Sequence, residues 1–321
     1  MADSVLCIDI GKQKFEVHLL VNGKGKSKSV KNSKEGFTVL SDWLRKYDAG
    51  HVHACMEATG SYDDELALYL HDAGHTVSIV NPARIKGFAQ SELIRTKNDT
   101  VDAGIIARFC LAMKPEPWTP PAPAVRRLQA IARRLDALIA MRTQELNRLG
   151  VAHSLVEPSI KEHLAYLDSE IDKLKKQMRS EIDKDPDLKT NRDLLITIPG
   201  ISDATISVML AELDFKKFES VREVVAFMGL APKETLSGSS VKGRPRLCKV
   251  GNARLRKSLY MPAMVAMRFN PVVADFSARL KEGGKNGKVI VCAAMRKLVH
   301  IIYGVLKTGK PFNPHYAQNI A

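Results

Sequence analysis

Val5-Leu6-Cys7-Ile8-Asp9 is a run of four apolar residues that ends in a carboxylate, within the first ten residues of a 321-residue chain. An unbroken apolar run of this length is typical of a strand buried on both faces. A second run, His51-Val52-His53-Ala54-Cys55-Met56-Glu57, also ends in a carboxylate. Strands usually end in neutral turn formers, so acids at two strand ends indicate a functional site.

A further acidic pair lies in Lys97-Asn98-Asp99-Thr100-Val101-Asp102, where the two aspartates are three positions apart. If this segment opens a helix, both carboxylates lie on one side, about one turn apart. Mg²⁺ prefers hard oxygen ligands, and two such ions about 3.5–4 Å apart support phosphoryl transfer. The sequence therefore predicts a Mg²⁺ site made by Asp9, Glu57, Asp99 and Asp102.

Simpler interpretations exist for single members of this set. Asp9-Ile10-Gly11 also begins the phosphate loop of actin-like and sugar kinases, although Gly11-Lys12-Gln13-Lys14 lacks the Thr or Ser of that loop. Asp99 suits a helix N-cap, and acids in a first turn suit the helix dipole. The four acids together favour a metal site over these simpler interpretations.

The charge balance points to a polyanionic partner. Lys and Arg number 49 against 35 Asp and Glu, a net charge of +14, and nucleic acid is the simplest ligand for such an excess. We expect no membrane partner, because no signal peptide or apolar run of membrane-spanning length is visible. The five scattered cysteines are typical of reduced thiols in a cytoplasmic protein.

Periodicity divides the chain into three regions. Residues 1–120 alternate strand and helix patterns, which predicts an α/β domain with a mixed sheet; within it, 15–21 and 76–80 are expected strands, 62–72 a helix, and 23–26 a turn. After a run of prolines, residues 121–188 carry apolar residues at 3,4 spacing, which predicts a helical hairpin or coiled coil. Two amphipathic helices packed on a neighbouring domain are the alternative.

Residues 189–321 are predicted to be mainly helical and strongly basic. The order Ile198-Pro199-Gly200-Ile201 followed by a small-residue helix is typical of a helix-hairpin-helix element, which offers backbone N–H groups to phosphate. An ordinary tight turn between packed helices fits equally well.

Between Ser237 and Lys257 there are seven Lys or Arg residues and no acid. Such a loop makes electrostatic contacts to phosphates, but an exposed serine beside glycines and arginines can also present a nucleophile to a phosphodiester. The candidate nucleic-acid ligands are Lys242, Arg244, Arg246, Lys249, Arg254, Arg256 and Lys257.

In the order and spacing of these motifs, the whole chain resembles the DEDD transposases of the insertion-sequence-110 family and their DNA-invertase relatives. The matching segments are Asp9-Ile10-Gly11-Lys12, Met56-Glu57-Ala58-Thr59-Gly60, Arg95-Thr96-Lys97-Asn98-Asp99-Thr100-Val101-Asp102-Ala103, Ile198-Pro199-Gly200-Ile201, Phe227-Met228-Gly229-Leu230-Ala231-Pro232, Ser237-Gly238 and Gly251-Asn252-Ala253-Arg254-Leu255-Arg256.

The resemblance implies a RuvC-like, RNase H-type first domain whose four carboxylates bind Mg²⁺, a coiled-coil insertion, and a transposase domain with a serine nucleophile. That serine maps to Ser237, with Ser239 and Ser240 as close alternatives. The family resemblance also implies donor and target DNA, a structured guide (bridge) RNA, homodimers that pair into a homotetramer, and a bacterial cytoplasmic, nucleoid-associated location.

Two rival functions remain open from the sequence. A hydrolytic junction nuclease would use the acidic site with water as nucleophile and would need no serine. A non-catalytic DNA- or RNA-binding derivative would need neither the acidic site nor the serine. The intact set of four acids argues against this function.

Overall fold

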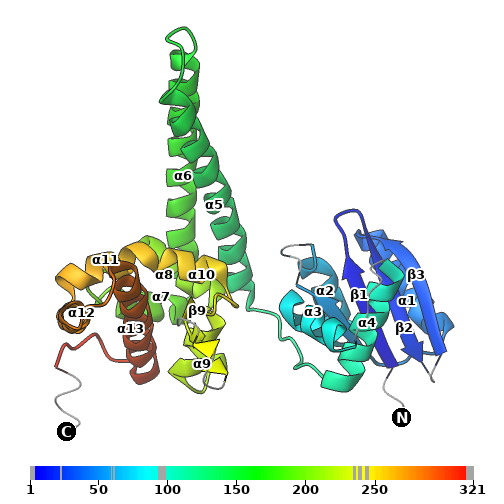
Figure 1. Cartoon of the computed structure of the whole chain (residues 1–321). Coiled ribbons are helices and arrows are strands. Elements are labelled where there is room, and N and C mark those ends of the chain that lie inside the picture. Colours follow the sequence, from blue (N-terminus) through cyan, green and yellow to red (C-terminus); the bar gives the residue numbers. More distant parts are fainter. Residues whose placement is uncertain are drawn as a thin grey trace. The chain divides into compact units, whose positions relative to one another are not determined.

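The computed structural model describes residues 4–21, 24–58, 60, 62–92, 99–233, 236–237, 241–242 and 246–315 (Figure 1). Only the backbone is described for 99–103, 236–237 and 241–242. The chain forms two compact units, Met1–Pro121 and Ala122–Ala321, and each is described by itself.

The first unit is built on a five-stranded sheet of order β3-β2-β1-β4-β5. Its strands are β1 (Ser4–Ile10), β2 (Lys14–Val21), β3 (Lys24–Lys31), β4 (Val52–Glu57) and β5 (Thr76–Val80). The first three strands pair antiparallel, whereas β4 lies parallel to both β1 and β5. The predicted mixed sheet is confirmed, and it is consistent with an RNase H-like domain.

The outer strand β3 corrects one prediction. Residues 23–26 are expected to form a turn, but Lys24, Gly25 and Lys26 belong to β3 and pair with Val21, Leu20 and Leu19 of β2. The strand reads KGKSKSVK and buries only Val30, so it lacks the alternating apolar signal from which strands are predicted. Lysines on an outer strand also discourage pairing with another sheet edge.

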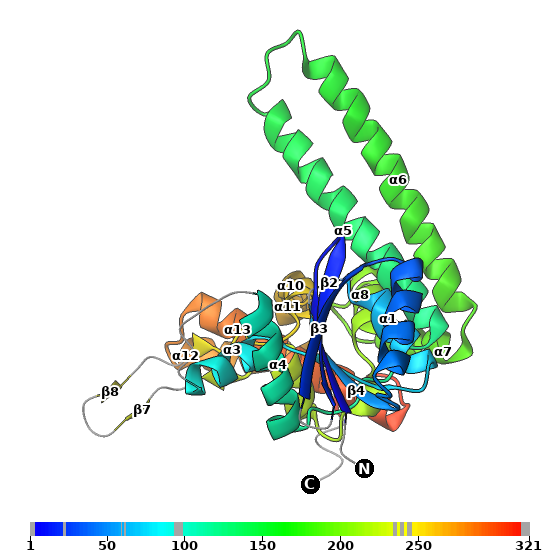
Figure 2. The ribbon, with the colours of Figure 1, turned by 90° about the vertical axis from the view of Figure 1, so that its right-hand side faces the viewer.

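Helices cover both faces of this sheet (Figure 2). One face carries α1 (Lys34–Lys46) and α2 (Asp64–Asp72), whose apolar side chains pack with Leu6, Ile8 and Phe15. The other face carries α3 (Pro82–Ser91) and α4 (Asp99–Met113). Odd-numbered residues of β1 therefore point toward α4, because successive side chains of a strand point to opposite faces.

The second unit begins with a helical hairpin, α5 (Pro123–Leu149) and α6 (Glu157–Asp183). The two helices pack along each other, and their far end extends away from the rest of the unit (Figure 1). Leu128, Leu135 and Leu138 of α5 and Leu167 and Ile171 of α6 are buried in the shared core. The two long helices predicted from the 3,4 spacing are thus present.

The remaining helices form a body around one continuous core that also includes the base of the hairpin. They are α7 (Pro186–Leu195), α8 (Asp203–Glu212), α9 (Val221–Phe227), α10 (Ala253–Ser258), α11 (Tyr260–Phe269), α12 (Pro271–Glu282) and α13 (Gly287–Thr308), with a short 3-10 helix, η1, at Phe215–Lys217. In the described part of the chain α13 alone is long and apolar enough to cross a membrane. Its buried residues, such as Leu298 and Ile302, line this core, as expected of a central helix.

Candidate active site and nucleic-acid interface

Asp9 and Glu57 lie side by side near the carboxyl ends of the neighbouring strands β1 and β4. The parallel pairing of β1 and β4 includes Ile8 opposite Met56, and the two acids directly follow this pair on their strands. Neighbouring strands are about 4.8 Å apart, so the two carboxylates can approach one ligand. Both residues are half-buried.

The helix α4 covers the face on which these acids lie. Cys7 and Cys55, two residues before Asp9 and Glu57, pack with the α4 residues Ile106 and Cys110. The thiol of Cys110 hydrogen-bonds with Cys55 and with His53 in the first half of β4. The last turn of α4 thus lies beside the start of β4, and its first turn is directed toward the carboxyl ends of the strands (Figure 1).

Two cysteines beneath the acids, Cys7 and Cys55, favour the neutral thiol. Burial raises the pKa of the Cys7 thiol well above its ordinary value. The hydrogen bond with Cys110, followed by burial, raises the pKa of Cys55. The same hydrogen bond, with a further one from His53, lowers the pKa of Cys110 to about 6, so the proton between Cys55 and Cys110 stays on Cys55.

Asn32 holds the two loops that follow the acidic strand ends. Its side-chain amide donates to the carbonyl oxygens of Gly11 and Tyr62, each at 3.1 Å. The loop after β1 turns tightly, with the Gly11 N–H donating to the Lys14 carbonyl at 2.9 Å. A Cβ at Gly11 would lie 2.8 Å from that carbonyl oxygen. Asn32 is a supporting residue that the sequence patterns did not indicate.

A fifth carboxylate, that of Glu16, is the cross-strand neighbour of Asp9 on β2. Burial alone would raise its pKa, but hydrogen bonds with Lys14 and Ser29 outweigh burial and lower it. The ammonium of Lys14 is 2.8 Å from the Glu16 carboxylate. Glu16 is therefore held ionised by its own partners beside Asp9. Its position in the alternating pattern of β2 gave no signal of this.

Carboxylates on rigid strands fit the hard-oxygen chemistry of Mg²⁺. Among the described side chains, no group of three or more His, Cys, Asp or Glu residues is arranged to hold a metal. The side chains of Asp99 and Asp102 lie outside that set, although both residues belong to the first turn of α4. Asp9 and Glu57 are the pair that the structure brings together.

The candidate nucleophile belongs to a small hairpin in the second unit. Pro232–Lys233 (β6) pairs with Arg246–Leu247 (β9), and Leu236–Ser237 (β7) pairs with Val241–Lys242 (β8). The backbone of Ser237 thus lies opposite that of Val241. Ser239, Ser240 and Arg244 lie outside the described residues, as do the side chains of Ser237 and Lys242.

The root of this hairpin is held by a set of contacts that we call the clasp, between residues 227–231 and 248–252. The N–H groups of Cys248, Lys249 and Asn252 donate to the carbonyls of Ala231, Gly229 and Phe227, at 2.9, 3.3 and 2.7 Å.

Arg256 and Gly251 complete the clasp. The Arg256 Nη1 donates to the carbonyls of Met228 at 3.1 Å and Lys249 at 3.3 Å. Gly251 has φ +136°, and a Cβ there would lie 2.3 Å from the Phe227 carbonyl oxygen. This close approach requires glycine.

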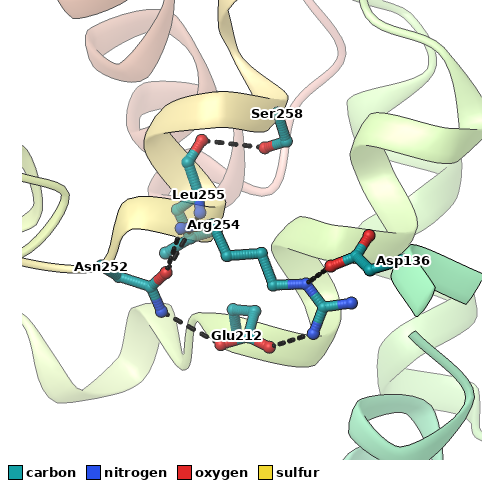
Figure 3. Close-up of polar contacts among 6 residues, drawn as sticks. All are labelled: Asp136, Glu212, Asn252, Arg254, Leu255 and Ser258. Atoms are coloured by element: carbon teal, nitrogen blue, oxygen red, sulfur yellow. Dashed lines mark hydrogen bonds and ion pairs between the residues drawn. The ribbon is translucent and has the colours of Figure 1, made fainter. Parts of the chain in front are cut away.

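Four polar residues next to the clasp form a second set of contacts, which we call the bracket: Asp136, Glu212, Asn252 and Arg254 (Figure 3). Glu212 accepts from Asn252 Nδ2 at 3.0 Å and from Arg254 Nη1 at 2.7 Å. The Arg254 Nε lies 2.8 Å from Asp136 Oδ2. The bracket therefore links α5, the end of α8 and the start of α10.

The structure separates the predicted basic ligands into two groups. Arg246, Lys249 and Lys257 are exposed, as contacts with a phosphate backbone require. Arg254 and Arg256 are half-buried and engaged by the bracket and the clasp. Arg133 of α5 joins Lys257 and Arg254 around an open cavity of about 480 Å³ beside the bracket.

The predicted helix-hairpin-helix element corresponds to α7, a turn at residues 196–202, and α8. Gly200 has φ +98° and its Cα packs so tightly on α11 that a Cβ would lie 2.8 Å from Ala266. The side chain of Asn270 donates to the Pro199 carbonyl at 3.3 Å. These are the contacts of a turn packed against another helix.

Comparisons with known proteins agree on the nature of the chain. A family model described as a transposase, of the DEDD type of insertion sequence 110, matches residues 6–152. A second, described as the transposase IS116/IS110/IS902 family, matches residues 192–278. Pilin gene-inverting proteins of Moraxella bovis and Moraxella lacunata are each 31% identical over 317 residues, which cover 98% of this chain and 98% of each relative.

The fold, the paired strand-end acids and these matches define a transposase or site-specific DNA recombinase. The chain belongs to the insertion-sequence-110 family of transposases.

Proposed function

We propose that this enzyme is an RNA-guided recombinase that cuts and rejoins the DNA strands of an insertion element. The proposal rests on one observation: Asp9 and Glu57 are neighbours near the carboxyl ends of β1 and β4. The helix α4 covers this face of the sheet, and its first turn contains Asp99 and Asp102. These four acids would hold Mg²⁺. When bound, Mg²⁺ neutralises charge that develops on the reacting phosphate.

Ser237 is the proposed nucleophile. Its Oγ attacks the phosphorus of the scissile phosphodiester, a phosphoserine bond forms, and the bond to one sugar oxygen breaks as that oxygen takes a proton. A sugar hydroxyl of the new strand then attacks the phosphoserine and releases the serine. Each step exchanges one phosphoester for another, so no nucleoside triphosphate is consumed.

The basic residues around the serine hairpin would bind the backbone phosphates. Arg246, Lys249 and Lys257 are exposed for this contact, and we propose the same role for Lys242 and Arg244. Arg254 and Arg256 would serve it only with a change of their present partners.

The same proposal extends to partners and location. We propose that donor and target DNA are chosen by a structured guide RNA, that the α5–α6 hairpin is a coiled coil within a homodimer that pairs into a homotetramer, and that the protein works at the nucleoid. Inversion of a DNA segment, the activity named for the two Moraxella relatives, is a second outcome of the same chemistry.

Trapping of a covalent protein–DNA adduct tests the proposal. Wild-type protein with Mg²⁺ and guide RNA should form an adduct that Ser237→Ala abolishes. An adduct that persists in Ser237→Ala but vanishes in Ser239→Ala or Ser240→Ala would move the nucleophile to that residue. Cleavage to free ends that depends on no serine between 237 and 240 would instead establish a hydrolytic nuclease.

A further inference from the structure

We infer that the bracket is a positioning device for the serine hairpin, with Glu212 at its centre, and that it sets the rate of strand attack. The inference rests on the proposed role of Ser237. It assigns a task to Asp136, Glu212 and Asn252, three residues outside the predicted site.

Glu212 is the residue through which the bracket acts. It is the last residue of α8, and its side chain is 16% exposed. One carboxylate oxygen accepts from Asn252 and the other from Arg254. Charged hydrogen bonds to a half-buried carboxylate are short and strong, so both partners are held in fixed positions.

Asn252 joins the bracket to the clasp. Its backbone N–H donates to the Phe227 carbonyl at 2.7 Å, and its side-chain Oδ1 caps α10 by accepting from Arg254 N and Leu255 N at 3.0 and 3.1 Å. Its Nδ2 donates to Glu212. A single residue therefore links α8, the first turn of α10 and the segment that leads into the serine hairpin.

Arg254 extends the same connection to the helical hairpin. Its side chain is 18% exposed, and its guanidinium bridges Glu212 and Asp136. Asp136 belongs to α5, which also donates from Gln129 Nε2 to the Ala211 carbonyl at 3.0 Å. The end of α8 is thus fixed to α5 by two independent contacts, and the clasp is fixed to both helices.

This arrangement matters for catalysis because a nucleophile must meet phosphorus in line. Ser237 lies on a hairpin whose described strand pairs lie beyond the clasp along the chain. Its direction depends on the root, which the clasp and bracket hold. A displacement of about 1 Å at a reacting group can reduce a rate by about 10²-fold.

The test compares Glu212→Ala with Glu212→Gln and with Asp203→Ala as a matched control. Asp203 is the first residue of the same helix and pairs with Arg192 at 2.9 Å, but it lies outside the clasp and bracket. Each full-length variant is assayed for single-turnover adduct formation at saturating DNA, for DNA affinity, for thermal stability, and for amide hydrogen exchange.

Glu212→Ala should reduce adduct formation by about ten-fold to 10²-fold at saturating DNA, with no loss of DNA affinity. It should also speed exchange of the Cys248, Lys249 and Asn252 amides. Glu212→Gln keeps one acceptor oxygen but places an NH2 donor where the other oxygen accepts, so it should restore only part of the rate. Asp203→Ala should lower thermal stability by a similar amount without changing the rate or those amides.

An unchanged adduct rate in Glu212→Ala, or an equal loss in Asp203→Ala, overturns the inference. So does unaltered exchange at the three clasp amides. Failure of the proposed function has a different signature: wild-type protein then forms no serine adduct, while the exchange measurement still shows whether Glu212 holds the root of the hairpin.

Discussion

Substitution of Gly251 by alanine probes the clasp most sharply. Gly251 has φ +136°, where L-residues are strained, and an added Cβ would lie 2.3 Å from the Phe227 carbonyl oxygen and 2.7 Å from the Gly229 nitrogen. Neither atom is the end of a flexible side chain. The two segments of the clasp must therefore separate.

The cost follows from three contributions. Backbone strain contributes about 1–3 kcal/mol, and loss of the hydrogen bonds from Asn252 N to Phe227 and from Lys249 N to Gly229 contributes about 1 kcal/mol each. We expect the second unit to lose about 4 kcal/mol. For a unit of about 200 residues this lowers Tm by roughly 8–16 °C.

Gly284→Ala is the matched control, because Gly284 has φ +71° with open space where a Cβ would lie. Gly284→Ala should lower the free energy of unfolding only through backbone strain, by about 1–2 kcal/mol. Scanning calorimetry of the full-length variants measures both shifts, and hydrogen exchange assigns them to the second unit. Equal Tm shifts for the two variants would refute the steric reasoning, because strain alone would then account for Gly251→Ala.

Three further predictions concern metal, salt and pH. Asp9→Asn or Glu57→Gln should reduce adduct formation by at least about 10³-fold, as should chelation of Mg²⁺, while gel-shift affinity for DNA persists. Replacing Arg246 and Lys249 by Gln should lower the slope of log affinity against log salt by about 0.9 for each lost phosphate contact with duplex DNA. Burial, followed by the charges of Arg296 and Lys297, lowers the pKa of His300. The unfolded state therefore binds more protons, and Tm should fall as pH drops below about 6.5. This fall should be smaller in His300→Gln.

The elements that sequence predicts well are those with a strong local signal. Val5–Asp9 and Val52–Glu57 were readable as strands because they are unbroken apolar runs, and the acids that end them lie side by side as expected. The long helices α5 and α6 follow from apolar residues repeated at 3,4 spacing. The strand β3 gives no such signal, because most of its residues are lysine and serine and its pairing depends on the neighbouring strand β2.

The bracket was not predictable from local patterns. Asp136, Glu212 and Arg254 are distant in sequence, and each alone has the appearance of a solvated charge. The basic segment around Arg254 predicts a phosphate ligand, whereas the fold surrounds Arg254 with Glu212 and Asp136. The single local signal was Glu212 itself, an acid at the end of the apolar stretch Val208-Met209-Leu210-Ala211.

The lysines of β3 have a practical consequence for handling the protein. Lys24, Lys26 and Lys28 alternate along the outer strand of the sheet, and their mutual repulsion keeps the edges of two copies apart. Molar salt, which strips bound nucleic acid, also shortens the range of that repulsion to about 3 Å. Purification at high ionic strength should therefore favour edge-to-edge aggregation once the polyanion is gone, and moderate ionic strength suits the free protein better.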